Sequence, residues 1–535
     1  MAKTSEMKHL PQPSGIRRNK RTGHAGRAFA IGLAAALAAG LLSGTALTAR
    51  TVSASSVPEV TLRVCNWEEY IDTGDWDEDE TIHLPDGDII GKQSMVKDFE
   101  DWYLKTYGVK VNVEYSTFGT NEDLYNMLTL GDVYDVVCPS DYMFMKLMSE
   151  DALVPLSDSF FDTSDPNNYY INGVSPYIKN IFDTKSIGGE NWSKYAAGYM
   201  WGVTGVVYNP KAVTEDEAST WTLFDNPKFK RRITIKDNVR DSYFMAVGAL
   251  KSKLLTSDSF LNDPDYSQNL ENEMNDTSPE MIKKVQNYLQ NVQGNVYSFE
   301  TDSGKADMIT GKVLANYQWS GDAVYTMDQA DEDNFELDFA VPKESTNIYF
   351  DGWVMLKKGI NGDSEKQKAA EAFINFLSRP DNAIRNMYYI GYTSVISGGE
   401  SPLIYEYLED RYGAKDGDTD TVPYDVNYFF SKDGTGDYVL TVPEEQTKRQ
   451  LFAQYPDGDT IARSSIMVYF DQAQNKAINQ MWVNVRCFNI NRTPWWGRIL
   501  TAAALAGLVY LAIRKVRAGR AEKKHRDAQN LRKAL

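Results

Sequence analysis

Hydrophobic and polar positions alternate in two different rhythms along the first third of the chain. Short runs with a period of two are typical of strands, and longer runs with apolar residues three or four apart are typical of helices. The strands we expect are Val60–Cys65, Val109–Tyr115 and Tyr134–Cys138, and the helices are Ser94–Tyr107 and Asn121–Leu130, with Thr120 or Asn121 as cap. Strands alternating with helices indicate an α/β fold with a mainly parallel sheet.

The same alternation returns further along, so we expect a second α/β lobe. Its expected strands are Arg232–Lys236, Val313–Trp319, Phe339–Pro342 and Ile348–Lys357, and its expected helices are Met281–Val292 and Glu371–Leu377. Two stretches break the pattern. Tyr405–Tyr438 is rich in Gly, Asp and Tyr and is interpreted as loops with short helices, and Asp72–Asp88 holds eight acids and is interpreted as a solvated loop insertion.

Two apolar runs lie near the ends of the chain. Residues 28–49 form an uncharged run of 22 behind a basic segment, which is typical of a secretory signal but is also long enough for a membrane anchor. Residues 499–513 are uncharged and apolar, with Trp495 and Trp496 before them and Arg514 and Lys515 after. Aromatic and basic flanks of this kind predict a transmembrane helix over 495–513 and a cytoplasmic tail.

The charge of the chain is strongly uneven. The net charge is −18 over 535 residues, but residues 1–27 carry +6 and residues 514–535 carry +7, so the body between them carries −31. A nucleic-acid-binding protein needs a basic surface, so this class of partner is disfavoured. An acidic body keeps a protein soluble, and it also attracts cationic ligands.

Histidine and cysteine are too scarce for several kinds of site. Only four His occur, and three of them lie in the basic tails, so a histidine-based catalytic dyad or a zinc site has little raw material. The three cysteines leave at least one thiol unpaired, so the chain is not a disulfide scaffold. We expect no metal or other cofactor and no enzymatic activity.

Aromatic and acidic side chains follow the ends of many expected strands. The segments are Asn66–Tyr70, Ser140–Tyr142, Asp237–Asp241, Trp319, Tyr349–Asp351 and, after a helix, Gly391–Tyr392. Ligands of open α/β sheets bind beyond the carboxyl ends of the strands. Aromatic faces attract cations and pack on methylene groups, and carboxylates pair with ammonium groups. The combination therefore favours a flexible organic cation over a neutral sugar or an anion.

Taken singly, these residues also have ordinary structural interpretations. Asp237 suits the N-cap of a helix, Arg240 suits an ion pair that orients a neighbouring acid, and Asp351 before a glycine suits a turn. Their convergence on several strand ends is what favours a binding site.

Seven segments, in order, resemble the spermidine/putrescine-binding proteins of ABC importers. They are Asn66–Tyr70, Pro139–Tyr142, Trp201–Asn209, Asp237–Asp241, Tyr349–Gly352, Phe373–Pro380 and Ile390–Tyr392, and the resemblance covers roughly residues 60–487. It implies a two-lobed periplasmic-binding-protein fold of type II that closes on its ligand. The chain would cross between lobes near Tyr199–Val203 and again near Asp351.

The resemblance also implies thirteen ligand contacts. From the first lobe we expect an aromatic box, two acids and a small polar contact: Trp67, Tyr70, Tyr142 and Tyr392; Glu68 and Glu69; and Ser140. From the second lobe and the crossing we expect two acids, a stacking ring, a hydroxyl and two further polar contacts: Asp241 and Asp351; Trp319; Thr301; and Asn238 and Tyr349.

Four features depart from the family pattern. Asn238 stands where a second acid is usual, Glu68 where a hydroxyl residue is frequent, and Tyr349 where a Trp is usual; Asp72–Asp88 is an insertion directly after the first binding segment. These departures leave the choice between spermidine and putrescine open.

We therefore predict a receptor that captures polyamines outside the cell membrane and delivers them to an ABC permease. The expected segments are 1–57 (signal or anchor), 58–200 and 351–400 (lobe 1), 201–350 and 401–490 (lobe 2), 495–513 (membrane helix) and 514–535 (cytoplasmic tail). Three alternatives remain open: a receptor for another organic cation, a ligand sensor, and a glycoside hydrolase that uses paired carboxylates.

Overall fold

The computed structural model describes residues 57–487, 499–500, 502–507, 509–511 and 514–515. The predicted signal or anchor at 28–49 lies outside these residues. The described chain falls into two compact units, one made of 57–276 with 295–470 and the other of 277–294 with the residues from 471 onward. The first unit is an α/β structure with two lobes.

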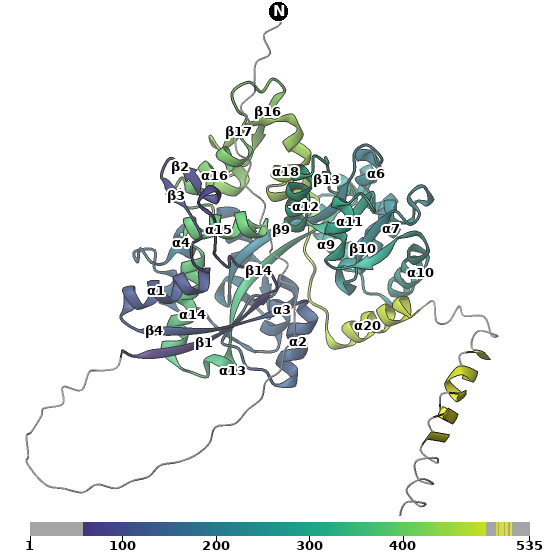
Figure 1. Cartoon of the computed structure of the whole chain (residues 1–535), viewed down its shortest axis with the longest axis horizontal. Helices are drawn as coiled ribbons and strands as arrows, with labels where there is room; N and C mark the ends of the chain where they lie inside the picture. The colour runs from purple at the N-terminus through teal and green to yellow at the C-terminus, as the bar shows by residue number, and fades with distance from the viewer. Residues whose placement is uncertain (1–56, 488–498, 501, 508, 512–513, 516–535) are drawn as a thin grey trace, which may run out of the picture. The chain divides into compact units, whose positions relative to one another are not determined.

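A sheet of twelve strands forms the centre of the first unit (Figure 1). Its main path runs β11–β10–β12–β9–β14–β5–β1–β4. Pairing is parallel within each lobe, between β1 and its neighbours β4 and β5 and between β10 and its neighbours β11 and β12. The predicted parallel sheet is thus present in each lobe, but the strands that join the lobes are antiparallel.

The first lobe contains the strands β1 (Glu59–Trp67), β4 (Lys110–Phe118), β5 (Val136–Val137) and β6 (Leu153–Val154). Its helices are α1 (Met95–Tyr107), α2 (Asn121–Leu130), α3 (Asp141–Ser149), α4 (Tyr169–Gly173), α5 (Pro176–Thr184), α13 (Lys357–Ile360), α14 (Ser364–Leu377) and α15 (Pro380–Ile390). Helices α1 and α2 begin where the sequence offers an N-cap, since the side chains of Ser94 and Thr120 each accept a hydrogen bond from a backbone N–H in the first turn of the helix they precede.

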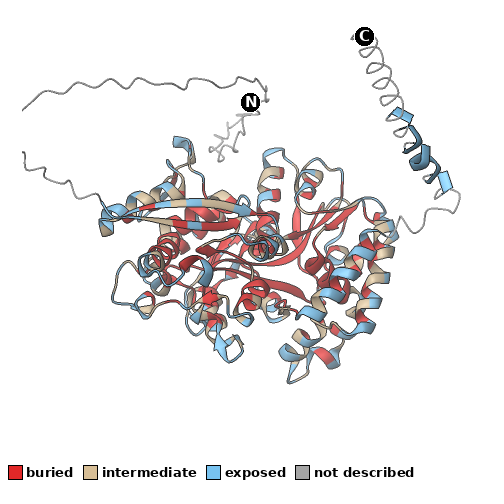
Figure 2. Ribbon diagram, turned by 90° about the horizontal axis from the view of Figure 1, so that it is seen from below, coloured by how far each residue is buried: buried red, intermediate tan, exposed pale blue. Residues whose placement is uncertain are grey.

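The second lobe contains the strands β10 (Ile233–Lys236), β11 (Ser298–Glu300), β12 (Ala315–Trp319) and β13 (Asp338–Ala340). Its helices are α6 (Glu215–Ala218), α7 (Val239–Leu255), α8 (Asp258–Leu261), α9 (Tyr266–Met274), α11 (Ser303–Ile309) and α12 (Ser320–Glu332). Figure 2 shows that the strands are buried while the helices keep one face exposed, which is the pattern of a sheet covered by helices.

Two long strands, β9 (Ala196–Tyr208) and β14 (Thr346–Leu356), belong to both lobes. They pair with each other antiparallel, and every residue of both is buried. One end of the pair adjoins β5 and β6 of the first lobe, and the other adjoins β12 and β13 of the second. The register of the pair shifts between Asp351 and Gly352. The two expected chain crossings fall within these strands.

The segment after α15 packs on both lobes. It contains β15 (Thr393–Ser394), α16 (Leu403–Tyr412), β16 (Thr421–Asp425), α17 (Asn427–Phe430), β17 (Val439–Pro443), α18 (Gln450–Gln454), α19 (Gly458–Ala462) and β18 (Ser464–Ser465). Helix α16 contacts α15, and α18 contacts α12 and β13. The short helices and loops expected over Tyr405–Tyr438 are present as α16, α17 and the segments around them, but β16 was not expected; it pairs with β17 in a hairpin whose Tyr424, Leu440 and Val442 are buried.

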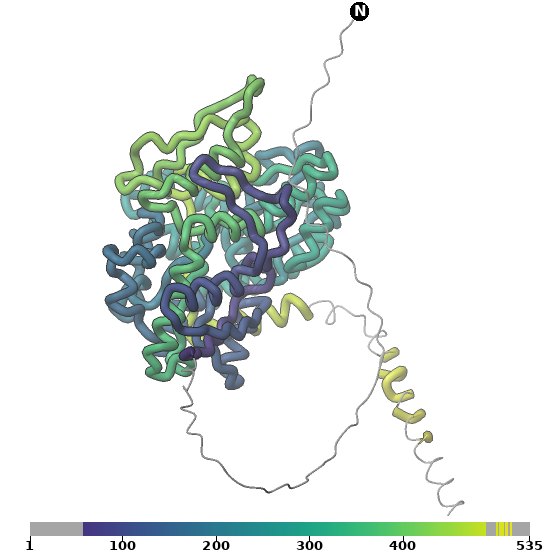
Figure 3. Tube along the Cα trace, turned by 60° about the vertical axis from the view of Figure 1, so that its left-hand side comes forward, coloured from purple at the N-terminus to yellow at the C-terminus, as the bar shows by residue number. Residues whose placement is uncertain are grey.

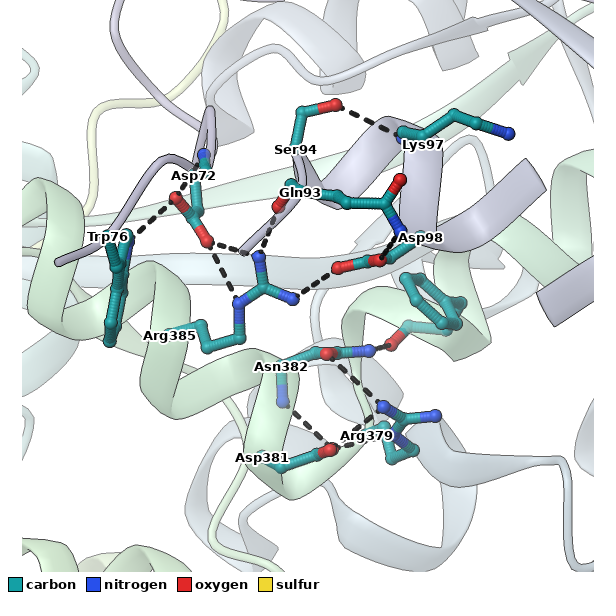
Figure 4. Close-up of polar contacts among 12 residues, drawn as sticks. Asp72, Trp76, Gln93, Ser94, Lys97, Asp98, Arg379, Asp381, Asn382 and Arg385 are labelled. Atoms are coloured by element: carbon teal, nitrogen blue, oxygen red, sulfur yellow. Dashed lines mark hydrogen bonds and ion pairs between the residues drawn. The ribbon is translucent and has the colours of Figure 1, made fainter. Parts of the chain in front are cut away.

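Most acids of the insertion Asp72–Asp88 are exposed, as expected of a solvated surface, but Asp72 is buried. The hairpin of the insertion, β2 (Ile82–Leu84) and β3 (Gly87–Ile89), contacts α16 and α15, and Figure 3 shows this purple segment beside the green ones. At the start of the insertion Asp72 is 1% exposed and accepts two hydrogen bonds from the guanidinium of Arg385. Arg385 also pairs with Asp98 at 2.7 Å (Figure 4). The ion pair between Asp72 and Arg385, which lie 313 positions apart in the sequence, explains why Asp72 is buried.

A small hairpin, β7 (Ser186–Ile187) with β8 (Glu190–Asn191), completes the first unit. The second unit contains the helices α10 (Pro279–Asn295) and α20 (Gln472–Arg486), linked by a hydrogen bond of 2.9 Å from Asn484 to Gln286. In the part of the chain that the structure describes, no helix combines the length and apolar character that crossing a membrane requires. The predicted span over 495–513 is therefore not supported, although several of its residues lie outside the described part.

Candidate functional site

A cavity of about 950 Å³ lies in the first unit, at the carboxyl ends of the strands of both lobes. All thirteen residues predicted to contact ligand line it: Trp67, Glu68, Glu69, Tyr70, Ser140, Tyr142, Asn238, Asp241, Thr301, Trp319, Tyr349, Asp351 and Tyr392. The structure thus brings together all thirteen residues that the family resemblance implied, whereas Asn66, Asp237 and Gly391 of the strand-end segments do not line the cavity. Contact of the thirteen with a ligand stays a prediction.

Strand ends and helix starts place these side chains. Trp67 and Trp319 are the last residues of β1 and β12, Ser140 precedes α3, and Asp241 lies in the first turn of α7. Because the parallel strands of each lobe point the same way, their carboxyl ends reach one edge of the sheet and open onto one space.

Asp351 is a buried acid of the cavity that two hydroxyl groups hold in place. It lies on β14 beside the register shift, is 4% exposed, and forms an isolated bridge with Ser140. The hydroxyls of Tyr70 and Ser140 each donate to one of its carboxylate oxygens at 2.6 Å. Burial raises the pKa of Asp351 to about 6, and the two donated hydrogen bonds oppose this rise. The carboxyl is therefore held by neutral donors and has no cationic partner among these contacts.

Asp241 is the second buried acid. The indole Nε1 of Trp319 lies 3.4 Å from its Oδ1. Burial raises the pKa of Asp241 to about 6, and the nearby charge of Lys236 counteracts part of the rise. A cationic ligand group would stabilise the ionised form of both Asp241 and Asp351.

The region before Asp241 differs from what we expected. Asn238, and not Asp237, caps helix α7, because its Oδ1 accepts from the backbone N–H groups of Arg240 and Asp241 at 2.8 and 3.2 Å. Only the amide nitrogen of Asn238 remains for a ligand.

Arg240 also departs from the expected ion pair. Its guanidinium lies 4.3 Å from the ring centre of Tyr142 and 3.8 Å from that of Phe470, and it donates to the carbonyl of Val468 at 2.6 Å. Arg240 thus links α7 to the Tyr142 ring of the other lobe by a cation–π contact.

Aromatic rings form one wall of the cavity. The rings of Tyr70 and Tyr392 meet edge to face with centres 4.8 Å apart, and Tyr70 meets Tyr199 in the same way at 5.6 Å. Tyr392 packs closely on Gly321, where a Cβ atom would come within 2.1 Å of its ring. The hydroxyl of Tyr392 donates to Asp322 at 3.2 Å, which joins the segment after α15 to α12.

The remaining predicted residues lie at the margins. Glu68 and Glu69 are exposed, and Glu69 adopts a left-handed backbone conformation with φ 54°. Tyr349 is 6% exposed and packs close to Gly202, and the carbonyl of Thr301 accepts a hydrogen bond from Lys236 at 3.2 Å.

Sequence reasoning missed several charged residues at the cavity: Asp141, Asp302, Lys305 and Asp322 line it, and Lys236 lies against Asp322. The Nζ of Lys236 lies 3.3 Å from Asp322 and 3.7 Å from the ring centre of Trp319. The Nζ of Lys305 lies 3.5 Å from Asp322 and 2.6 Å from Asp302. Their strand-end and helix-start positions were the available signal, but lysine was not among the residue types sought there.

Metal binding has no geometric support in the described residues, where no three His, Cys, Asp or Glu side chains are grouped so as to hold an ion. The side chains that make up the site are carboxylates, aromatic rings and the two lysines Lys236 and Lys305.

Comparison with known proteins gives a consistent family. Residues 94–401 match the family described as bacterial extracellular solute-binding protein. The chain is 25% identical over 382 residues to the spermidine/putrescine-binding periplasmic protein of Escherichia coli, covering 71% of this chain and 90% of that protein. It is 26% identical over 287 residues to the putrescine-binding periplasmic protein SpuD of Pseudomonas aeruginosa, covering 52% and 69%.

Solved structures agree on the fold. A putative spermidine/putrescine ABC transporter protein from Listeria monocytogenes superposes with a TM-score of 0.53 at 21% identity, covering 80% of this chain and 99% of that one. The substrate-binding protein PotD from Streptococcus pneumoniae gives 0.50 at 22% identity, with the same coverage. These similarities support the α/β two-lobed fold.

Proposed function

Because the chain belongs to the bacterial extracellular solute-binding protein family, we propose that its cavity captures polyamines for import through an ABC permease. The family consists of solute-binding proteins, so the chain is not an enzyme and the glycoside hydrolase alternative is dropped. The binding body, which spans both lobes, would lie outside the cytoplasm, as the names of its relatives say for those proteins.

One observation carries the choice of ligand. Two buried carboxylates, Asp351 and Asp241, face one cavity whose walls also hold Tyr70, Tyr392 and Trp319. Buried acids with raised pKa values gain from a cationic partner, and aromatic faces accept both ammonium groups and methylene chains. A linear diamine or triamine offers both features, whereas a neutral sugar would leave the carboxylates without a counter-charge.

Isothermal titration calorimetry tests this proposal. The full-length chain is purified in detergent and titrated with putrescine, spermidine and butane-1,4-diol, which has the same carbon chain as putrescine without its charges. Saturable binding of a polyamine and no binding of the diol are expected. A folded protein that binds neither polyamine would contradict the proposed ligand class.

We further propose that the chain is tethered to the membrane by residues 495–513. The support is the sequence pattern alone: an apolar run with paired Trp on one side and Lys and Arg on the other. A tether would raise the local concentration of the receptor at a permease in the same membrane.

Membrane fractionation tests the tether. Full-length chain is expected to stay in the pellet after alkaline carbonate extraction, and a chain ending at Ile490 is expected to be released. To separate the two apolar runs, the N-terminal sequence of both purified chains is determined. Release of the full-length chain by carbonate would overturn the tether.

A further inference from the structure

We infer that Lys236 is a built-in cation that fills one ammonium position of the cavity and makes it selective for diamines over triamines. The inference rests on the proposed polyamine function and deepens it. It concerns the corner of the cavity lined by Thr301, Trp319, Asp322 and Lys305; Lys236 is buried against the first three of these residues.

Lys236 occupies this corner as a ligand ammonium would. Its residue is 1% exposed, and its Nζ contacts the Asp322 carboxylate at 3.3 Å, the Thr301 carbonyl at 3.2 Å and the face of the Trp319 ring at 3.7 Å from the centre. A carboxylate, a carbonyl and an aromatic face are the partners that recognise an alkylammonium group. The protein's own side chain already holds all three.

Lys305 completes the neutralisation of the corner. Its Nζ lies 3.5 Å from Asp322 and 2.6 Å from Asp302, and its side chain is 19% exposed. Two lysines thus face two aspartates. Burial would raise the pKa of Asp322, but the charges of Lys236 and Lys305 lower it below its ordinary value. Asp322 is therefore an ionised, fully paired acid, and it offers no unmet negative charge to a ligand.

The rest of the cavity differs in charge state. Asp351 receives hydrogen bonds from the neutral hydroxyls of Tyr70 and Ser140, and no lysine or arginine of the described residues forms an ion pair with it. Asp241 meets the indole N–H of Trp319. Asp351 and Asp241 thus accept hydrogen bonds from neutral donors, while Asp322 is paired with both Lys236 and Lys305. A ligand can place one ammonium group at Asp351 and one at Asp241, whereas an ammonium group that extends to Asp322 would meet the charges of two lysines.

Affinities of the full-length protein for putrescine and spermidine, measured by calorimetry at one ionic strength, test the inference. Wild type is expected to bind putrescine at least as tightly as spermidine. In Lys236→Met, which keeps the length of the side chain and removes its charge, Asp322 loses one of its two lysine partners, and the spermidine-to-putrescine affinity ratio is expected to rise about tenfold.

Two further variants sharpen the result. Lys236→Arg keeps the charge and is expected to keep the wild-type ratio. Lys236→Met combined with Asp322→Asn removes the acid as well, and is expected to cancel the gain for spermidine. A ratio that does not rise in folded Lys236→Met overturns the inference.

If Lys236→Met does not fold, the affinities of the wild-type protein for putrescine and spermidine still test the inference. Spermidine binding tenfold tighter than putrescine to wild type would overturn the inference while leaving the polyamine function intact. Failure of wild type to bind either amine would instead overturn the proposed function.

Discussion

Asp351 is buried, and each of its carboxylate oxygens accepts a hydrogen bond of 2.6 Å, one from the hydroxyl of Tyr70 and one from that of Ser140. An ionised carboxylate in that place gains from an ammonium partner, and an amide gains far less. For Asp351→Asn we expect polyamine affinity to fall by roughly 10- to 100-fold, which corresponds to about 1.5–3 kcal/mol for one charge-assisted hydrogen bond. Calorimetry gives the affinity.

Thermal unfolding of the ligand-free Asp351→Asn protein provides the control. Since burial opposes ionisation of Asp351, its replacement by a neutral amide is not expected to lower the unfolding temperature at about pH 7.5. Weaker binding accompanied by a large loss of stability would show that the residue is structural and would contradict a ligand role.

Because Asp351 and Asp241 have raised pKa values, we expect a fall in pH to stabilise the ligand-free fold and to weaken the binding of a cation. Their folded pKa values of about 6 lie above the value of about 3.9 for unfolded chains. Their contribution to the stability of the ligand-free fold is therefore fully present below about pH 4 and is lost as the pH rises through about 6. Binding of a cation needs the ionised forms, so affinity is expected to weaken as the pH falls below about 6.

Titrations between about pH 5 and 8 measure this dependence, with unfolding temperatures recorded with and without ligand. For each carboxylate the affinity is expected to approach a tenfold loss per pH unit well below its pKa, a slope that follows from one proton taken up per site. Asp351→Asn is expected to show a flatter profile. An affinity that stays constant across this range would be incompatible with both assignments.

At the scale of elements, Gly321 of helix α12 packs directly against the ring of Tyr392, in the turn after α15. A Cβ at Gly321 would lie 2.1 Å from the ring of Tyr392, and Gly391 approaches the carbonyl of Gly321 closely. Gly321→Ala must separate these elements, so we expect polyamine affinity to fall at least tenfold, an effect of about 1.4 kcal/mol. Gly458→Ala in α19 is the matched control, because no atom lies within 4 Å of its Cβ position. Equal affinities of the two variants would refute the close-approach argument.

The Arg385 cluster fixes the insertion to helix α15. Arg385→Met leaves Asp72 buried without its cation, and breaking a buried pair in this way costs about 3–5 kcal/mol of unfolding free energy. Denaturant unfolding measures the loss. Arg379→Met is the control, because the pair of Arg379 with Asp381 is about one-third exposed and should contribute about 0–1 kcal/mol. Adding Asp72→Asn to Arg385→Met should restore part of the stability; no restoration would contradict the buried-charge explanation.

Local pattern was sufficient for elements whose stability is local. The caps Ser94 and Thr120 and the strand end at Trp319 follow from residue type and periodicity, and β1 runs only two residues past its predicted end at Cys65, so the position of the cavity could be predicted. The hairpin of β16 and β17 could not be predicted, because the burial of Tyr424 involves a hydrogen bond to the carbonyl of Tyr455, 31 positions away, which the local pattern does not reveal.

Charge pairs between distant residues account for the other differences. Asp72 forms an ion pair with Arg385, 313 positions away in the sequence, and Lys236 forms one with Asp322, 86 positions away. A lysine at the end of a strand ordinarily faces water, and only the fold shows that Lys236 points into the protein. Asn238 illustrates a local competition, since the cap of α7 uses the oxygen that a ligand was expected to contact.

At the scale of the whole binding body, two strands connect the lobes and two side-chain contacts hold them across the cavity. The hydroxyl of Tyr392 donates to Asp322, and Arg240 lies over Tyr142. These contacts need no ligand, so a closed state is expected to be populated in its absence, and a ligand would raise that population through its extra contacts.

Single-molecule energy transfer tests this expectation, with dyes on cysteines placed at the exposed positions of Leu130 and Leu254 after Cys487→Ser. Tyr392→Phe removes one hydrogen bond of the closed state, worth about 1 kcal/mol, and should lower the ligand-free ratio of closed to open protein roughly fivefold. Tyr389→Phe is the control, because the hydroxyl of Tyr389 contacts Thr73 within one lobe. If both variants match wild type, closure does not depend on the Tyr392 contact, and ligand alone must supply the free energy that brings the lobes together.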